Sequence, residues 1–429
     1  MEDKPMKQLE QAARLLAILT GLGAEGAQVQ IRESEKHILS MSGSEIDTLA
    51  TDHSSTASLK LQKGLAFVEK SYSFGSEAEF PALAGSAMAE LDGAPEDPDD
   101  AIFPLEEEYA VSDLRSSFDP AAMTECLSRL RADIASVGAV LNEATLSYEV
   151  RRTALTSTNG TRYAFETDGY QISYAAVLEQ DGRTVDPFRG HCGFRKPQDF
   201  RFETDSLLAQ NASMLFTQKK CEPFTGSLLI APQSLYYLLM DHFFAQLFED
   251  SLLSGGSAWS DSFGKQVCDP RFSASMDPTH PGVTFGEQIT QDGCRAKPYD
   301  LIRNGILQNA IAGQKPARML KIPPSGNTAD NLVLPAGETP LSELLRQTEK
   351  GVLVFSFGGD GSPDGSFSGV ASVSFLVENG KIVCALEDCP VSGNWFTILS
   401  EGNFTLSRER VSDGEYVLPW MKIENITFS

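Results

Sequence analysis

The chain has no run of lysine and arginine residues and no long apolar segment, and these absences exclude whole classes of protein. Its 35 basic residues stand against 59 acidic ones, which gives a formal net charge of -24. Proteins that bind nucleic acids or anionic membranes draw their affinity from basic patches, so we expect neither kind of partner. No stretch of about 18 apolar residues occurs, so we expect no membrane-spanning helix.

Cysteine and histidine are scarce as well. The seven cysteines are odd in number, scattered and without a CxxC pair, a pattern typical of reduced thiols in the cytoplasm. The five histidines include no pair at the spacing of metal ligands. The first 23 residues begin with acidic side chains and lack a small-residue cleavage site, so they predict an amphipathic helix and not a secretion signal. We therefore expect a cytoplasmic protein.

The length of 429 residues is enough for two domains, each with its own core. The composition changes around residues 219–225, which predicts an N-terminal domain of residues 1–220 and a C-terminal domain of residues 221–429. We expect an α+β fold in which the first domain combines helices with an antiparallel sheet. The second domain is expected to be β-rich with a long central helix.

Local signals define several elements of the first half. Asp119–Pro120 predicts the start of a helix, because aspartate caps an N-terminus and proline fits the first turn. Asn159–Gly160 lies between two alternating segments and predicts a β-hairpin. Short alternating pieces predict short strands at residues 27–32, 37–41 and 56–61.

Other segments indicate a loop and the elements of the second half. Glu90–Glu108 is acidic and rich in proline, which predicts a solvated loop. Gly226–Ala231 is a buried-looking strand, and it precedes the predicted long helix, which lies within Leu235–Ser257. Further on, short apolar pieces separated by Gly, Pro, Asn and Asp predict many short strands.

A series of short segments runs through the second half of the chain. They are LLMDHFFAQLFEDSLLSGGS (238–257), DPTHPG (277–282), LIRNGIL (301–307), NLVLPAG (331–337), DGSFSGVA (364–371), VENGKIV (377–383) and SGN (392–394). In content and order these segments resemble the TldD/PmbA family of bacterial metallopeptidases and their partner subunits, once called modulators of DNA gyrase. The resemblance covers about half of the chain, and the first half matches the family only in its pattern of helix and strands.

Two departures from the family pattern concern the metal. Catalytic members carry HExxxH on the central helix, whereas Met240, Asp241 and Ala245 stand at the matching positions here. A thioether, a shortened carboxylate and a methyl group cannot build a zinc site. Catalytic members also have a late cysteine, and the corresponding stretch Ser407–Glu415 has none. The chain is therefore similar to the PmbA/TldE branch, and we expect no catalytic residue, metal or cofactor of its own.

The resemblance implies a function in proteolysis. A TldD-type partner with an HExxxH motif would supply the zinc, and this chain would shape an enclosed space in which peptides are cleaved. It could present its backbone to an extended peptide by strand addition. Two loops are expected to face the substrate. Their residues are Gly255, Gly256, Ser257 and Trp259 in the first loop, and Asp364, Ser366, Ser368 and Gly369 in the second.

Two alternatives stay open. The chain could be an autonomous peptidase with a site outside the family pattern, using His242 and Asp241, or a homodimeric peptide-binding or regulatory protein without catalysis. The sequence does not separate a homodimer from a heterodimer.

Other candidate sites are weaker. His242, Gln246 and Glu249 are better explained as a polar stripe on an apolar helix. Adjacent His191 and Cys192 in a strand point to opposite faces and cannot form a dyad.

Overall fold

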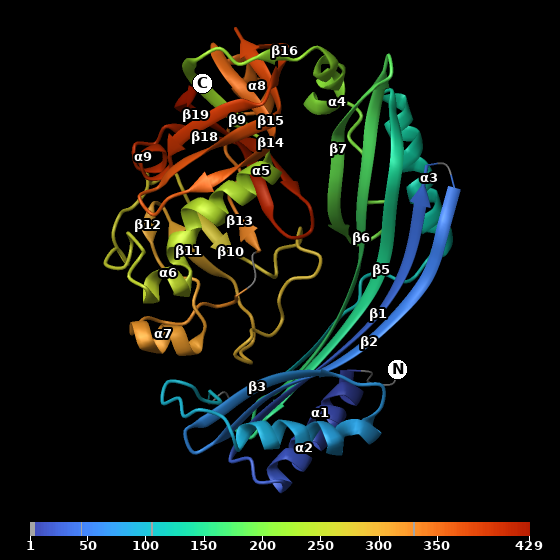
Figure 1. Cartoon of the computed structure of the whole chain (residues 1–429), viewed down its shortest axis with the longest axis vertical. Helices are drawn as coiled ribbons and strands as arrows, with labels where there is room; N and C mark the ends of the chain where they lie inside the picture. Colours follow the sequence, from blue (N-terminus) through green and yellow to red (C-terminus); the bar gives the residue numbers. More distant parts are fainter. Residues whose placement is uncertain (1–4, 44, 104–105, 329–330) are drawn as a thin grey trace.

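Two sheets with helices around them make up the molecule (Figure 1), and the computed structural model describes residues 5–43, 45–103, 106–328 and 331–429. The first sheet contains β1 (Gly26–Ser42), β2 (Glu45–Lys63), β3 (Ala66–Ser73), β4 (Glu108–Asp113), β5 (Ala139–Ser157), β6 (Arg162–Gln180) and β7 (Arg183–Phe194). The second sheet contains β8 (Lys219–Lys220), β9 (Phe224–Ile230), β10 (Ala274–Met276), β11 (Tyr299–Arg303), β12 (Ile306–Leu307), β13 (Leu332–Val333), β14 (Lys350–Gly361), β15 (Ser366–Glu378), β16 (Lys381–Glu387), β17 (Cys389–Asn394), β18 (Phe404–Ser412) and β19 (Val417–Phe428).

Helices lie beside the first sheet and between the strands of the second. Those of the first part are α1 (Pro5–Gly21), η1 (Glu77–Glu79), α2 (Phe80–Leu91) and α3 (Pro120–Ser136). The connection to the second sheet holds α4 (Leu207–Asn211) and η2 (Ala212–Thr217). Those of the second part are α5 (Pro232–Tyr237), η3 (Leu238–Phe243), η4 (Phe244–Leu247), α6 (Glu249–Leu253), α7 (Gln314–Leu320), α8 (Leu341–Arg346) and α9 (Trp395–Ser400). The expected α+β fold is confirmed, while the division at residue 220 stays a prediction.

The first sheet is curved, and its long strands pass beside and beneath the second part (Figure 1). The strand order is β3-β2-β1-β5-β6-β4, and β7 also pairs with β6. The sheet was expected to be antiparallel, and β4 departs from this because it pairs with β6 in parallel. Helices α1 and α2 cover one face of the β1–β2 end, where Leu15, Phe80 and Val29 are buried together. Helix α3 covers the same face further along, against Leu39 and Leu146.

The prediction of short strands at residues 27–32, 37–41 and 56–61 was wrong in length. Strand β1 runs without interruption through Glu33–Lys36, because it pairs with β2 on one side and β5 on the other over that stretch. Each backbone group there has a ladder partner, so polar side chains do not end the strand. The helix at Asp119–Pro120 and the hairpin at Asn159–Gly160 are as predicted.

Five strands of the second sheet close into a barrel. Strand β19 pairs with β9, β9 with β14, β14 with β15, β15 with β17, and β17 with β19 again. The strand Gly226–Ala231 was therefore placed correctly, since β9 lies between two partners. The core of the barrel includes the fully buried Phe243, Phe272 and Trp395.

The acidic segment after α2 lies against the second part of the chain. Lys315 of α7 donates hydrogen bonds to Asp97 and Asp100, at 2.5 and 3.1 Å, and Arg318 donates to the carbonyl of Asp99. The described part of the segment is irregular, as predicted. These contacts make it less solvated than expected. Residues 104 and 105 of the predicted loop fall outside the described residues. In the described residues, no helix is long and apolar enough to cross a membrane.

Candidate functional site

The segment that resembles the family's central helix is helical but irregular. After α5 it widens into a π-helical turn, in which the N–H of Phe244 donates to the carbonyl of Leu239, five residues back. The prediction of one long regular helix was wrong at Phe248, whose backbone is extended (φ -68°, ψ 145°). There the main chain of Leu247 and Glu249 bonds to Ile311, and this pairing replaces the next helical bonds.

The wide turn is relevant to the spacing of the metal motif. Positions i and i+5 are about 140° apart around a regular α-helix, so HExxxH does not place both histidines on one face of it. A π-helical turn bonds i to i+5 and brings such positions closer together. Met240 and Ala245 stand at these two positions, next to that turn. The chain thus has a backbone shape that suits the spacing.

The side chains at the degenerate motif do not fit a zinc ion. Met240 is 5% exposed and packs in the barrel core, Asp241 is exposed, and Ala245 is half-buried. Within the described ranges, no group of three or more His, Cys, Asp or Glu side chains could hold a metal ion. In the stretch Ser407–Glu415, Ser407 is fully buried, donates to the carbonyl of Glu409 and accepts from the N–H of Trp420. The donor set offers a thioether and one carboxylate, which is too few ligands.

His242, Gln246 and Glu249 do not form a surface stripe. His242 and Gln246 are buried, and each polar group contacts a different segment. The imidazole of His242 lies against Gly361, where an added Cβ would be 2.7 Å from its Cγ. Gln246 Oε1 accepts from Ala258 N at 2.9 Å, and Glu249 Oε2 accepts from Gly313 N at 2.9 Å. The three side chains contact three different segments and do not form a common site.

The two loops expected to face the substrate lie close together through Phe396. The rings of Trp259 and Phe396 are 5.4 Å apart, and Gly365 has no side chain where Phe396 packs. The expectation of a second loop was wrong for Ser366, Ser368 and Gly369, which belong to strand β15 and pair with β14 and β17. Exposure differs along both segments. Gly255, Gly256, Asp364 and Ser368 are exposed, Ser366 and Gly369 are half-buried, and Ser257 and Trp259 are buried. The exposed members are therefore the ones that can meet a ligand.

A polar cavity of about 790 Å³ lies between the curved sheet and the segment Phe285–Gln291 of the second part. The sheet residues that line it are all polar. They are Gln28, Gln30, Arg32, Ser34, Lys36, Asp52, Ser54, Ser58, Lys60, Glu69, Glu149, Arg151, Thr153 and Thr167. The sequence analysis missed this cavity. The unbroken alternation of polar residues from Gln28 to Lys36 was the signal that could have indicated it.

A second space, the aromatic cleft of about 610 Å³, lies between β7 and the barrel. Phe188, Phe200, Phe355 and Trp420 are among its lining residues. Cys192 also lines it, and burial raises the pKa of this thiol to about 12. A thiol with a raised pKa stays protonated and is a poor nucleophile, which agrees with the sequence analysis.

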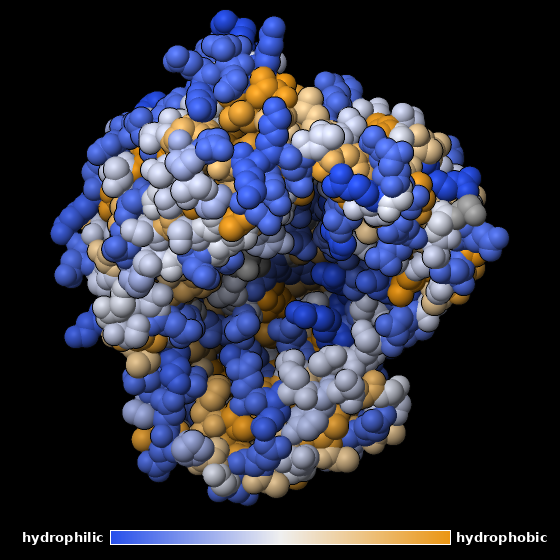
Figure 2. All heavy atoms as spheres, turned by 45° about the horizontal axis from the view of Figure 1, so that its top comes forward, coloured by the Kyte–Doolittle hydropathy of each residue, from blue (hydrophilic) through white to orange (hydrophobic). Residues whose placement is uncertain are grey.

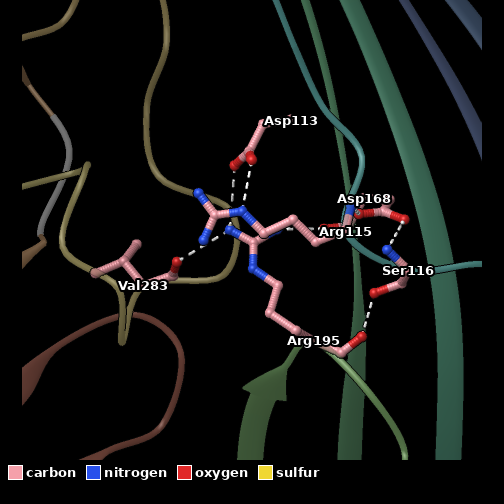
Figure 3. Close-up of polar contacts among 6 residues, drawn as sticks. All are labelled: Asp113, Arg115, Ser116, Asp168, Arg195 and Val283. Carbon is pink, nitrogen blue, oxygen red and sulfur yellow. Dashed lines mark hydrogen bonds and ion pairs between the residues drawn. The ribbon is translucent and has the colours of Figure 1, made fainter.

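A cluster of charged side chains joins the two parts next to these cavities (Figure 3). Arg195 donates to the main-chain carbonyl of Asp168 at 2.6 Å and to that of Val283 at 3.5 Å, and its Nη2 lies 3.6 Å from an oxygen of Asp113. Burial lowers the pKa of Arg195 from its ordinary value, and Asp113 opposes that shift. The fully buried carboxylate of Asp168 accepts from Arg115 N, Ser116 N and the hydroxyl of Tyr148. The cluster fixes the second part against the curved sheet.

Comparison with known proteins assigns the class. Residues 225–429 match the family model described as the PmbA/TldA metallopeptidase C-terminal domain. The metalloprotease PmbA of Escherichia coli O157:H7 is 27% identical over 188 residues, which are 40% of this chain and 41% of that protein. A metalloprotease of Methanocaldococcus jannaschii is 25% identical over 224 residues, 49% of each chain. The chain thus spans less than half the length of these two relatives.

The fold similarity extends over the whole chain. TldE from Thermococcus kodakarensis has a TM-score of 0.82 and 13% sequence identity, and the match covers 98% of this chain and 100% of that one. A Thermotoga maritima protein described as a candidate modulator of a DNA gyrase also has a TM-score of 0.82, with 20% identity and coverage of 98% and 99%. The second half is thus a metallopeptidase-family domain. Residues 225–429 are similar to the TldD/PmbA family in sequence, and the whole chain shares the fold of the two solved structures.

Proposed function

We propose that this chain is a PmbA/TldE-type subunit without a metal site, which binds peptides for cleavage by a zinc-bearing TldD-type partner. The observation that carries the proposal is the segment that resembles the family's central helix, which has a wide turn but Met240, Asp241 and Ala245 at the ligand positions. Met240 fills this place with apolar atoms and packs in the core. A helical segment whose turn suits the spacing, but whose side chains cannot bind zinc, fits a subunit whose partner performs the chemistry.

The two loops around Phe396 support a role in substrate contact. The exposed backbone of Gly255 and Gly256 lies on one loop, and exposed Asp364 and Ser368 lie on the other. Packing between Trp259 and Phe396 holds the loops near each other. In the proposed dimer, these loops face the space where an extended peptide is held, and edge strands could pair with its backbone. The proposed location of the complex is the cytoplasm.

The proposal is tested by purifying this chain alone, a TldD-type HExxxH protein of the same organism alone, and the two after co-expression. We expect peptide cleavage by the pair, zinc in the partner, and neither zinc nor cleavage in this chain alone. Stoichiometric zinc in the isolated chain, with cleavage that a chelator abolishes, would show an autonomous peptidase instead. A stable homodimer that does not bind or activate the partner would show a separate peptide-binding function.

A pair of bulky substitutions tests the loops. Ser368→Trp places a large side chain at an exposed position near the start of β15, and we expect it to lower cleavage by the pair without lowering the melting temperature. Lys381→Trp is the matched control, because Lys381 is exposed at the start of β16, outside both loops. Equal activity of the two variants would count against a substrate-facing role for the loop.

A further inference from the structure

The polar cavity contains an arginine whose charge has no partner. The side chain of Arg32 makes no hydrogen bond or ion pair with any residue in the described part of the chain, although it is accessible to solvent within the cavity. Its neighbours across the sheet are Thr56 on β2 and Thr153 on β5, both uncharged. The molecule is hollowed on the face drawn in Figure 2, where hydrophilic residues predominate at the opening. A solvent-accessible guanidinium is therefore available to a ligand.

Most acidic side chains around the cavity are already engaged. Glu149 accepts two hydrogen bonds from Arg151, both at 2.9 Å, and a third from Ser34 at 2.6 Å. Glu69 pairs with Lys60 at 3.2 Å. Glu287 accepts from the main-chain N–H and the hydroxyl of Thr328, at 2.7 Å each. Glu287 and Glu149 attract Arg32 electrostatically, but within the described residues none of these acids forms an ion pair with it.

The other cations of the cavity are placed differently. Lys36 lies on the same face of β1, but its cross-strand neighbours are Asp52 and Glu149. Arg151 is held by Glu149, and its guanidinium stacks over the ring of Phe285, 4.0 Å from the centroid. Burial, and then the charge of Arg151, lower the pKa of Arg32 from its ordinary value, as expected for a cation without an adjacent anion. Arginine remains charged at neutral pH all the same.

We propose that Arg32 binds a carboxylate of an extended peptide that occupies the polar cavity. A guanidinium presents a planar fork of N–H donors that matches a carboxylate in two parallel hydrogen bonds. The volume of about 790 Å³ lies within the range of ligand pockets, about 300–1,000 Å³. Amide and hydroxyl groups of Gln30, Ser34 and Thr153 line the same space and can bond to a peptide backbone. The proposal rests on the peptide-binding function above and names the group that is recognised.

The carboxylate could belong to the C-terminus of the peptide or to an Asp or Glu side chain, and the probes separate these sources. Four fluorescein-labelled octapeptides share one neutral sequence. The first has a free C-terminus, the second a C-terminal amide, the third the amide plus one central Glu, and the fourth the amide plus one central Gln. Binding to the purified full chain is measured by fluorescence anisotropy at about 0.15 M salt, where the Debye length is about 8 Å and repulsion from the net charge of -24 is screened.

We expect the first peptide to bind more tightly than the second, or the third more tightly than the fourth, by at least about tenfold. Arg32→Gln should weaken that binding about tenfold to a hundredfold, because a charge-assisted bond is lost. Lys36→Gln removes the same charge from the same strand and cavity, and Lys70→Gln removes it from the face where Lys70 pairs with Glu90. Both controls should change binding less than about threefold.

Equal binding of all four peptides would overturn the proposal, and so would equal weakening by Arg32→Gln and Lys36→Gln, which would indicate unspecific electrostatics. Tighter binding of a single-stranded oligonucleotide than of any peptide would also overturn it. The result does not depend on a partner, since the isolated chain is measured. If the co-expressed pair cleaves neutral peptides but the isolated chain binds all four labelled peptides equally, the proposed function is supported and only the role of Arg32 is rejected.

Discussion

Replacing Asp168 by asparagine tests how much its buried carboxylate stabilises the first part of the chain beside the junction cluster. The buried carboxylate accepts from Arg115 N at 2.8 Å, Ser116 N at 2.9 Å and the Tyr148 hydroxyl at 2.9 Å. Asparagine keeps one acceptor oxygen, and the tyrosine hydroxyl can rotate to accept from the new amide. One backbone N–H is then left unpaired in the interior, which costs about 1–3 kcal/mol.

The expected effect is measured by thermal unfolding and by hydrogen exchange. For a unit of about 200 residues, 1 kcal/mol shifts the melting temperature by about 2–4 °C, so a loss of about 2 kcal/mol lowers it by about 4–8 °C. Exchange of the amides of Arg115 and Ser116 should become faster. Asp186→Asn is the control, because its ion pair with Arg189 is exposed on both sides and contributes less than about 1 kcal/mol. Equal melting temperatures for the two variants would refute the reasoning.

Three further predictions concern the helix, the interface and the acidic segment. Met240→Ala should lower the free energy of unfolding by about 2–5 kcal/mol in denaturant titrations, because Met240 is buried. Asp241→Ala should lower it by less than about 0.5 kcal/mol, because Asp241 is exposed. Similar losses for the two variants would contradict the apolar packing of Met240. Gly193→Ala should lower the melting temperature, since the new Cβ would lie 2.8 Å from the side-chain oxygen of Thr284. The hydrogen bond from Lys315 lowers the pKa of Asp97. The stability that this pair gives the fold is therefore present at neutral pH and is lost as the pH falls below about 4. Carboxyl NMR titration should show a higher pKa for Asp97 in Lys315→Met.

Elements with a local cause were predictable from the sequence. Asp119 caps α3 through a bond from Ala122 N to its side chain at 2.9 Å, which needs only residues three positions apart. Asn159–Gly160 makes its hairpin because Gly160 adopts a positive φ of 88°. The family pattern of the second half was also visible, because ordered segments survive at low identity. These signals depend on near neighbours in sequence, and the structure confirms them.

Features with a distant cause were not predictable in the same way. The break at Phe248 arises from backbone pairing with Ile311, which lies more than sixty residues further along the chain. The polar cavity needs the curved sheet to meet Phe285–Gln291, and no local pattern specifies that meeting. The polar alternation around Arg32 showed only that one face of β1 avoids apolar contact. Whether such a face meets bulk water or an enclosed space is decided by the packing of the whole molecule.

The proposed function assigns different roles to the central helix and the polar cavity. Met240 closes the ligand position with apolar packing, so this chain has no means there to activate water, whereas Arg32 retains an unneutralised charge in a space of peptide size. A contact made equally in the bound substrate and in the transition state changes KM and leaves kcat unaltered. In the co-expressed pair, Arg32→Gln should therefore raise KM for a carboxylate-bearing peptide and preserve kcat. A fall in kcat at unchanged KM would place Arg32 in the chemical step instead, and the division of roles would be wrong.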